Sequence, residues 1–301
     1  MKTVGIVLSL TLVLLSSGIC VGQENFVDGV DLTTIRAPWT VRILGNDLDI
    51  TIVKAQANEQ SGYFMMVNEA KGLNVSVFIE PVDKCKTSEG CRDYTLNYGN
   101  PGWGKFQDLA KGKIKDFSYF EFYRPEAFGK PLKMLDMYAE YVSDGYWVDL
   151  HISKALYKKE DHKLFEDVVN AVRFLPKNDG TDAAFVAQRS KAAAASASWL
   201  ELWDSKKCGE SFLAMSSITR AENTKGSWSD YCVMVNGELG LKRSRTLIAS
   251  AYTRSLLPKT ARPLAIHAYH TNFANRSSVV EIMGLLLEKD GNWTVSNYIP
   301  Q

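Results

Sequence analysis

The stretch Pro176-Lys177-Asn178-Asp179-Gly180-Thr181-Asp182 separates two parts of the chain that follow different periodic patterns. It is polar and rich in turn-forming residues, which is typical of a linker. At about 150 residues per domain, the length of 301 residues also favours two domains. We therefore predict one domain over residues 24–176, a linker over residues 177–182 and a second domain over residues 183–301.

The part before the linker has the pattern of an antiparallel sheet closed by a helix. Lys71-Gly72 and Asp144-Gly145 are turn-forming pairs and predict two hairpins. From residue 160 to residue 174 the apolar residues recur at helical spacing, which predicts an amphipathic helix. We expect an α+β domain. Its predicted strands, in which apolar and polar residues alternate, are Trp39–Leu44, Leu48–Lys54, Tyr63–Val67, Leu73–Ile79, Met137–Val142 and Tyr146–Ile152.

After the linker the order is inverted, with helices first and strands last. Three helices are expected over residues 183–205, 210–220 and 227–239, the last ended by Gly240. Asp290-Gly291 predicts the turn of the final hairpin. The fold expected here is a three-helix plus four-stranded antiparallel cone, in which the helices cover one face of a curved sheet. The four predicted strands are Arg245–Arg254, Leu264–Phe273, Val279–Glu288 and Trp293–Ile299.

The first residues of the chain predict export. Lys2 is followed by an apolar run from Val4 to Leu15, too short for a membrane span and typical of a secretory signal peptide. We predict a signal peptide over residues 1–22, cleaved after Gly22. The alternative is a lipoprotein anchored through Cys20, but the bulky Ile19 before it disfavours lipidation. No later stretch of sequence approaches the length of a membrane span.

Export makes the cysteines informative, because disulfides persist in oxidising compartments. Cleavage leaves four cysteines, which allow three pairings. Pairing Cys85 with Cys91 and Cys208 with Cys232 keeps each bridge inside its own domain. A zinc site is the alternative, but it requires tight Cys-x2-Cys spacing, which the chain lacks. We therefore expect two structural disulfides.

Overall charge excludes several classes of protein. With 35 Lys and Arg against 34 Asp and Glu, the composition is neither that of a disordered chain nor that of a strongly basic nucleic-acid binder. The charge is unevenly divided, with a balance of −4 over residues 23–176 and +4 over residues 177–301. Three interpretations fit: attraction between the domains, an anionic ligand or acidic partner on the second domain, or a solvated edge strand. The basic excess is concentrated in Lys242, Arg243, Arg245, Arg254, Lys259 and Arg262.

No catalytic or cofactor motif emerges from the sequence. Asp149, His151 and Ser153 share one strand face, but residues two apart lie roughly 6.5 to 7 Å apart along a strand, too far for Ser153 to be activated. His267 and His270 fall on opposite faces of a strand and so cannot bind one metal ion together. The glycine-rich loop at residues 99–105 lacks the pattern of a phosphate-binding loop. We predict no cofactor and no metal.

The second half resembles a known family. Trp199-Leu200, Asp204, Trp228, Leu239-Gly240 and Arg245, followed by Glu281 and the ending Asp290 to Tyr298, look like the bacterial family called domain of unknown function 4019. This resemblance implies a nuclear transport factor 2-like cone but no activity. The first half, through its closing helix and the strand Trp147 to Ser153, more loosely resembles PsbP-like sandwiches. Together the two resemblances imply a bacterial protein, periplasmic or secreted.

The function expected from these observations is that of a non-catalytic binding or accessory module of the bacterial envelope. Its partner would be an envelope protein or a small anionic ligand, bound at the concave face of the second domain or at the basic strand beside it. The alternative is a small-molecule hydrolase or isomerase with its site in the mouth of the cone. The candidate binding residues are Arg243, Arg245, Trp228, His267 and Tyr269.

Overall fold

The structure of the chain is a computed structural model. It describes residues 29–45, 49–54, 61–68, 71–98, 107–127, 130–177, 183–253 and 262–301. The predicted signal peptide at residues 1–22 and residues 178–182 of the predicted linker lie outside these ranges. The glycine-rich loop at residues 99–105, Arg254 and Lys259 lie outside them as well.

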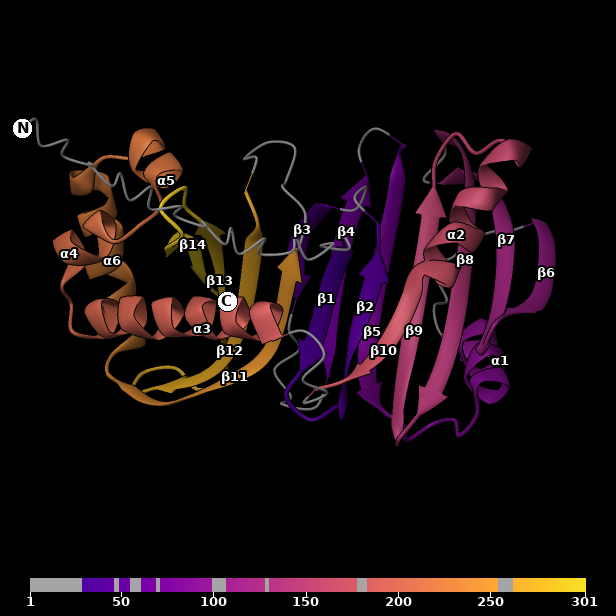
Figure 1. Ribbon diagram of the computed structural model, residues 1–301, viewed down its shortest axis with the longest axis horizontal. Coiled ribbons are helices and arrows are strands. Elements are labelled where there is room, and N and C mark those ends of the chain that lie inside the picture. Colours follow the sequence, from indigo (N-terminus) through magenta and orange to yellow (C-terminus); the bar gives the residue numbers. More distant parts are fainter. Residues whose placement is uncertain are drawn as a thin grey trace, which may run out of the picture.

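The described strands form two antiparallel sheets of seven strands each (Figure 1). Sheet A has the order β10-β2-β1-β11-β12-β13-β14, and sheet B has the order β3-β4-β5-β9-β8-β7-β6. The strands of sheet A are β1 (Gly29–Thr34), β2 (Trp39–Leu44), β10 (Val172–Pro176), β11 (Lys242–Thr253), β12 (Leu264–Phe273), β13 (Val279–Leu287) and β14 (Trp293–Pro300). Those of sheet B are β3 (Asp49–Lys54), β4 (Gly62–Asn68), β5 (Leu73–Pro81), β6 (Gln107–Ile114), β7 (Phe117–Ala127), β8 (Lys130–Ser143) and β9 (Tyr146–Lys154).

Short turns set the register of the hairpins. Asp144 and Gly145 both have positive φ, 52° and 77°, as a tight turn between β8 and β9 requires. Gly72, with φ 61°, follows Lys71 in the turn between β4 and β5. Gly291, with φ 83°, lies in the turn between β13 and β14. All three predicted turns are therefore confirmed.

The main hydrophobic core joins residues of both sheets. Alternate residues of β5, such as Val75 and Val77, are fully buried in the same cluster as Val41 of β2 and Ile248 of β11. The helix α2 (His162–Ala171) adds Phe165 and further apolar residues to this cluster. Burial of one face of each sheet explains the alternation in their sequences, because side chains alternate between the two faces of a strand.

A second core lies between the other face of sheet A and the helices that follow residue 182. Figure 1 shows α3 (Ala183–Asp204) lying across the strands of this part of the sheet. Trp199 and Trp203 of α3 are buried with Met283 of β13 and Tyr298 of β14. The other helices in this part are α4 (Cys208–Leu213), α5 (Ser217–Glu222) and α6 (Lys225–Leu239). The remaining helix, α1 (Ser88–Tyr98), packs on β7 and β8 of sheet B.

Two helix predictions need correction. The helix expected over residues 160–174 ends at Ala171, because Val172–Pro176 pairs with β2 as the edge strand β10. The helix expected over residues 210–220 is two short helices. Between them, Met215 forms an isolated β-bridge with Val295. The side chain of Ser216 then caps the N-terminus of α5 by accepting a hydrogen bond from the Thr219 amide at 3.1 Å.

Sheet A contains strands from both halves of the sequence. β1 pairs with β11, so sheet A contains three strands from before residue 177 and four from after it. The four predicted strands of the second half therefore belong to a wider sheet. The second half also has four helices in its described residues, where three were expected. The division of the chain at residues 177–182 remains a prediction.

Candidate functional site

Arg245, one of the candidate binding residues, lies in an ion-pair network inside the second core. Its Nε donates to Glu281 Oε2 at 2.6 Å, and its Nη1 donates to Asp204 Oδ2 at 2.7 Å. Glu281 has no exposed surface and also accepts hydrogen bonds from Thr271 and from the Tyr298 hydroxyl. Burial lowers the pKa of the Arg245 guanidinium, but the bonds to the two carboxylates outweigh burial and raise it. Arg245 is therefore held by the protein itself.

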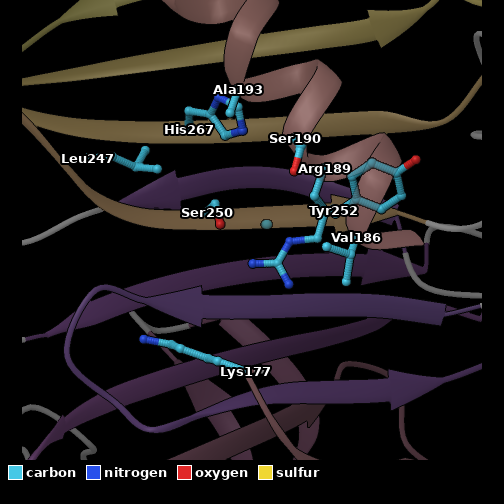
Figure 2. A pocket seen from close by; sticks show the side chains of 10 residues that line it. Lys177, Val186, Arg189, Ser190, Ala193, Leu247, Ser250, Tyr252 and His267 are labelled. Atoms are coloured by element: carbon cyan, nitrogen blue, oxygen red, sulfur yellow. The ribbon is translucent and has the colours of Figure 1, made fainter. Parts of the chain in front are cut away.

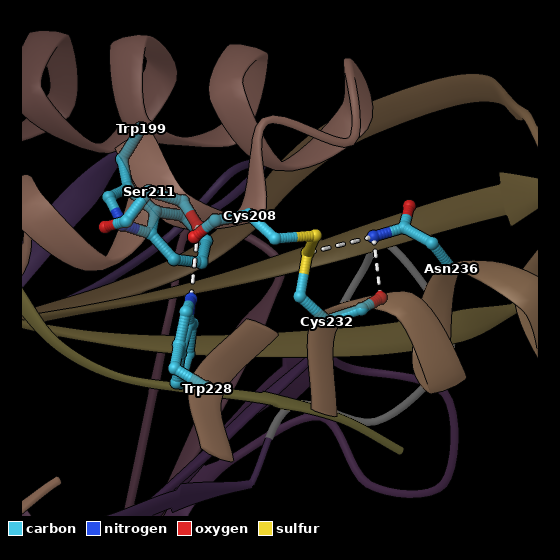
Figure 3. Close-up of a disulfide and its surroundings, with 6 residues drawn as sticks. All are labelled: Trp199, Cys208, Ser211, Trp228, Cys232 and Asn236. Atoms are coloured by element: carbon cyan, nitrogen blue, oxygen red, sulfur yellow. Dashed lines mark hydrogen bonds between the residues drawn. A yellow bond between two sulfur atoms is a disulfide. The ribbon is translucent and has the colours of Figure 1, made fainter. Parts of the chain in front are cut away.

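Trp228 of α6 also belongs to the scaffold. Its indole packs edge to face on Trp199 and Trp203, with ring centroids 6.0 and 5.7 Å away, and its Nε1 donates to Ser211 Oγ at 3.0 Å. Figure 3 shows this contact next to the disulfide between Cys208 and Cys232. Arg243 is exposed on β11.

Both predicted disulfides are confirmed. Cys85 is bonded to Cys91, and Cys208 is bonded to Cys232. The second bridge ties α4 to α6, and Asn236 Nδ2 lies 3.6 Å from Cys232 Sγ beside it (Figure 3). No group of His, Cys, Asp and Glu in the described residues is arranged to hold a metal ion.

Replacing Cys208 and Cys232 together by alanine is expected to lower the free energy of unfolding by about 3 kcal/mol, because the bridge closes a loop with a sequence separation of 24. Guanidinium unfolding of the purified protein measures the loss. The double variant of Cys85 and Cys91 is the matched control, and its loss should be smaller because that separation is only 6. Equal midpoints for the Cys208/Cys232 variant and the unaltered protein would contradict the expectation.

His267 and Tyr269 lie on the face of sheet A that α3 covers. The Tyr269 hydroxyl is 2.7 Å from Ser196 Oγ of α3, and its ring meets that of His267 edge to face at 6.2 Å. His267 is 5% exposed and lies directly opposite Ser250 of β11. Tyr269 therefore positions α3 on the sheet, whereas His267 lies at the margin of this contact.

A cavity of about 240 Å³ begins where His267 lies, between the first half of α3 and strands β11 and β12 (Figure 2). Its lining combines apolar side chains, such as Ala193 and Leu247, with polar and basic ones. The residues that line the cavity are Lys177, Val186, Arg189, Ser190, Ala193, Leu247, Ser250, Ala251, Tyr252 and His267.

Two cationic side chains, those of Lys177 and Arg189, line this cavity. Lys177 Nζ donates to the carbonyl oxygens of Thr34 and Ile35 at 2.6 and 2.9 Å, and Arg189 Nη2 donates to Thr33 Oγ1 at 3.3 Å. Burial, followed by the charge of Arg189, lowers the pKa of Lys177. Among the described residues that line the cavity there is no Asp or Glu. The site thus brings positive charges close to each other in a partly desolvated place.

His267 adds a neutral polar group to the same cavity. Burial, assisted by the charge of Arg189, lowers its pKa to about 4, so the imidazole is uncharged at neutral pH. Its Nδ1 is buried and has no hydrogen-bond partner in the described part of the chain. A buried imidazole nitrogen without a partner is unfavourable, and a ligand in the cavity would supply one.

Of the residues that line this cavity, only His267 is a candidate on sequence grounds. Lys177 falls in the predicted linker, and Arg189 and Ser190 fall in a predicted helix with no pattern that indicates a site. These residues come together because Lys177, directly after β10, reaches across to the end of β1 at Thr34 and Ile35, while α3 packs on the face of sheet A that contains His267. No local pattern predicts this arrangement.

Comparison with known proteins supports the predicted resemblance of the second half. Residues 195–298 match the family described as protein of unknown function (DUF4019). The match includes Ser250 and His267 but not Lys177 or Arg189. A search of curated proteins gives no match. None of the helices in the described ranges combines the length and hydrophobicity needed to span a membrane.

Two solved structures are similar to the chain at low identity. The solution structure of cyanobacterial PsbP (CyanoP) from Synechocystis sp. PCC 6803 is 16% identical, with a TM-score of 0.34, over 53% of this chain and 98% of that one. A crystal structure from Bacteroides thetaiotaomicron VPI-5482 is 8% identical, with a TM-score of 0.36, over 88% of each chain.

Proposed function

We propose that the protein is a binding module of the bacterial envelope, periplasmic or secreted, that takes a small oxyanion with an apolar body into the cavity under α3. The observation that carries this proposal is the set of groups that line one cavity: the cations of Lys177 and Arg189 and the unpartnered Nδ1 of His267. The two disulfides are consistent with an extracytoplasmic location. We retain the nuclear transport factor 2-like cone as a proposal for the second half.

Electrostatics favour an anion over a cation or a neutral ligand. Burial, and after it the charge of Arg189, lowers the pKa values of both Lys177 and His267, so each of these groups carries a proton less readily than in water. An oxyanion between them would offset this repulsion and accept hydrogen bonds from the cationic groups. Charge-assisted hydrogen bonds of this type are shorter and stronger than neutral ones.

The cavity also shapes the rest of the ligand. Val186, Ala193 and Leu247 contribute apolar surface among the polar groups, and the volume of about 240 Å³ suits a small molecule. Ligand sites generally combine apolar surface with a few polar groups that orient the ligand. A carboxylate or phosphate attached to a small hydrocarbon group matches both kinds of lining residue.

Binding is a better account of His267 than acid–base catalysis. An efficient general base has a pKa near the working pH, whereas burial holds the pKa of His267 at about 4. No carboxylate among the described lining residues orients the ring. Of the residues predicted from the sequence, we therefore assign His267 to the ligand site and Arg245, Trp228 and Tyr269 to the scaffold that supports it.

The proposal is tested by calorimetric titration of the purified protein with inorganic phosphate, acetate and benzoate. We expect saturable binding. It should be tightest for benzoate, because its ring can also contact the apolar lining residues. Replacing Arg189 by methionine should weaken binding about 10-fold to 100-fold, the effect of losing a hydrogen bond to a charged group.

The matched control is Lys191→Met, which removes an exposed cation from the same helix but outside the cavity. This variant should bind each probe as the unaltered protein does. Absence of saturable binding for all three probes would overturn the proposal, and so would equal weakening by Arg189→Met and Lys191→Met.

A further inference from the structure

A second unusual place in the molecule lies in sheet B, on the face covered by α1. Glu140 of β8 and Asp149 of β9 are direct cross-strand partners there. Directly paired residues of neighbouring antiparallel strands have Cβ atoms about 4.5 to 5.5 Å apart. Glu140 has no exposed surface, and Asp149 Oδ1 is shielded from solvent. Asp149 as a whole is half-buried. Two carboxyl groups thus share one largely buried site, although like charges placed opposite each other destabilise a sheet.

The hydrogen bonds around this pair are incomplete. Glu140 Oε2 accepts a hydrogen bond from Trp147 Nε1 at 2.5 Å. Glu140 Oε1 and Asp149 Oδ1 have no partner in the described part of the chain, and neither has Thr95 Oγ1, which α1 buries nearby. A proton on one carboxyl group would supply the missing donor. Two fully ionised carboxylates at this place would leave several buried acceptors unsatisfied.

In the described part of the chain, no ion pair joins a cation to Glu140 or Asp149. The Arg124 guanidinium, on β7, donates to Asp136 of β8 at 2.7 and 2.8 Å, and His151 of β9 lies 2.9 Å from the same carboxylate. The ionic groups of α1 are engaged elsewhere. Asp93 pairs with Arg92 and with Lys111 of β6, and Glu89 pairs with Lys113 of β6.

The remaining charges that face the pair come from the neighbouring strands. Glu80 of β5 disfavours ionisation of both carboxyl groups, and His151 favours ionisation of Asp149. On α1 the group that faces Glu140 is the neutral hydroxyl of Thr95. The surroundings are therefore more acidic than basic, and a proton is the simplest positive charge that the site can take up.

We propose that the Glu140–Asp149 pair holds bound protons in the native protein up to about neutral pH, and that loss of the first of these protons in a more alkaline medium loosens α1 from sheet B. The fold would then contain a pH-sensitive contact, separate from the cavity under α3. The contact would tighten in acid and weaken as the medium becomes alkaline.

The direction follows from the ionisation of the two groups. Burial, together with the neighbouring Asp149, raises the pKa of Glu140, and burial raises the pKa of Asp149 to about 7. An acid whose pKa is higher in the folded state contributes stability that is fully present below its ordinary pKa. That stability is lost as the pH rises through the folded value, which for Asp149 is about 7.

Nuclear magnetic resonance of the full chain tests the proposal through Trp147. Its indole N–H donates to Glu140, so its resonance should titrate with the pair between pH 5 and pH 9. Hydrogen-exchange protection of residues 88–98, corrected for intrinsic exchange rates, should fall at least 10-fold across the same midpoint.

Asp149→Asn removes the carboxyl group whose pKa is about 7 and should abolish the change in α1 protection near neutral pH. Glu140→Gln removes the charge of the other group but keeps the shape of its side chain. Because burial is the main cause of the raised pKa of Asp149, the midpoint near pH 7 should remain in this variant. The control Glu89→Gln, on the exposed side of α1, should leave both profiles unchanged. A Trp147 resonance that does not titrate, or α1 protection with the same pH profile in Asp149→Asn as in the unaltered protein, would overturn the proposal.

Discussion

Replacing Arg245 by methionine is expected to lower the free energy of unfolding by about 3 to 5 kcal/mol, the usual loss when one partner of a buried ion pair is removed. The reason is the environment of Glu281, which has no exposed surface and takes two hydrogen bonds from this guanidinium. Methionine fills part of the volume but leaves the carboxylates of Glu281 and Asp204 without their common cation. Denaturant unfolding followed by circular dichroism measures the change.

Arg243→Met is the matched control, because Arg243 is two residues away on β11 and exposed. Its free energy of unfolding should stay within about 0.5 kcal/mol of that of the unaltered protein, as for most surface substitutions. Similar unfolding curves for the two variants would show that Arg245 is not a central ion-pair residue. This comparison also matters for binding studies, because a charge reversal at Arg245 would disrupt the fold rather than a surface.

His267 is expected to make the protein lose about 3 kcal/mol of stability in acid, since a shift of one pKa unit corresponds to about 1.4 kcal/mol. Its pKa is lowered from 6.5 to about 4 in the folded state, mainly by burial. A base with a lowered folded pKa contributes stability that is present above its ordinary value. That stability is lost as the pH falls from 6.5 towards 4.

Unfolding free energies at pH 7.5 and pH 4 measure this contribution, when the unaltered protein is compared with His267→Asn. The comparison between variants is needed because the Glu140–Asp149 pair changes stability in the opposite direction over part of the same range. The same replacement at His270, three residues along β12 on the opposite face, is the control. Equal acid sensitivity in His267→Asn and the unaltered protein would contradict the assignment.

Much of the local structure could be predicted from the sequence. The Asp144-Gly145 and Lys71-Gly72 turns, the strand from Leu264 to Phe273 and the long helix from Ala183 all lie where their patterns predicted them. The two disulfides followed from cysteine spacing. These features depend on backbone preferences and on alternation over a few residues, which the sequence states directly.

Other elements were missed because their state depends on distant partners. Residues 172–176 continue the helical spacing of α2, yet they form β10 because β2 offers an unpaired edge. β6 is exposed along nearly its whole length and lacks the alternation of a half-buried strand, so pairing with β7 alone reveals it. Tertiary pairing overrides local preference in both places.

The residues of the candidate site also divide into one that local sequence predicted and others that only distant contacts brought together. Its one residue predicted from the sequence, His267, was a candidate because it shares a strand face with Tyr269. The positive charge was expected from Arg243 and Arg245, and nothing in the sequence analysis pointed to Arg189. The residue patterns by themselves determined the hairpins, the long helix, the cysteine pairs and the alternation that buries one face of each sheet. Only the tertiary structure decided that β1, β2 and β10 extend the sheet of the second half, that Arg245 is neutralised in the core, and that Lys177 and Arg189 line one cavity with His267. The physical reason is that turns and periodicity act over a few residues, whereas charge pairing and cavity formation depend on which distant surfaces the packed sheets bring together.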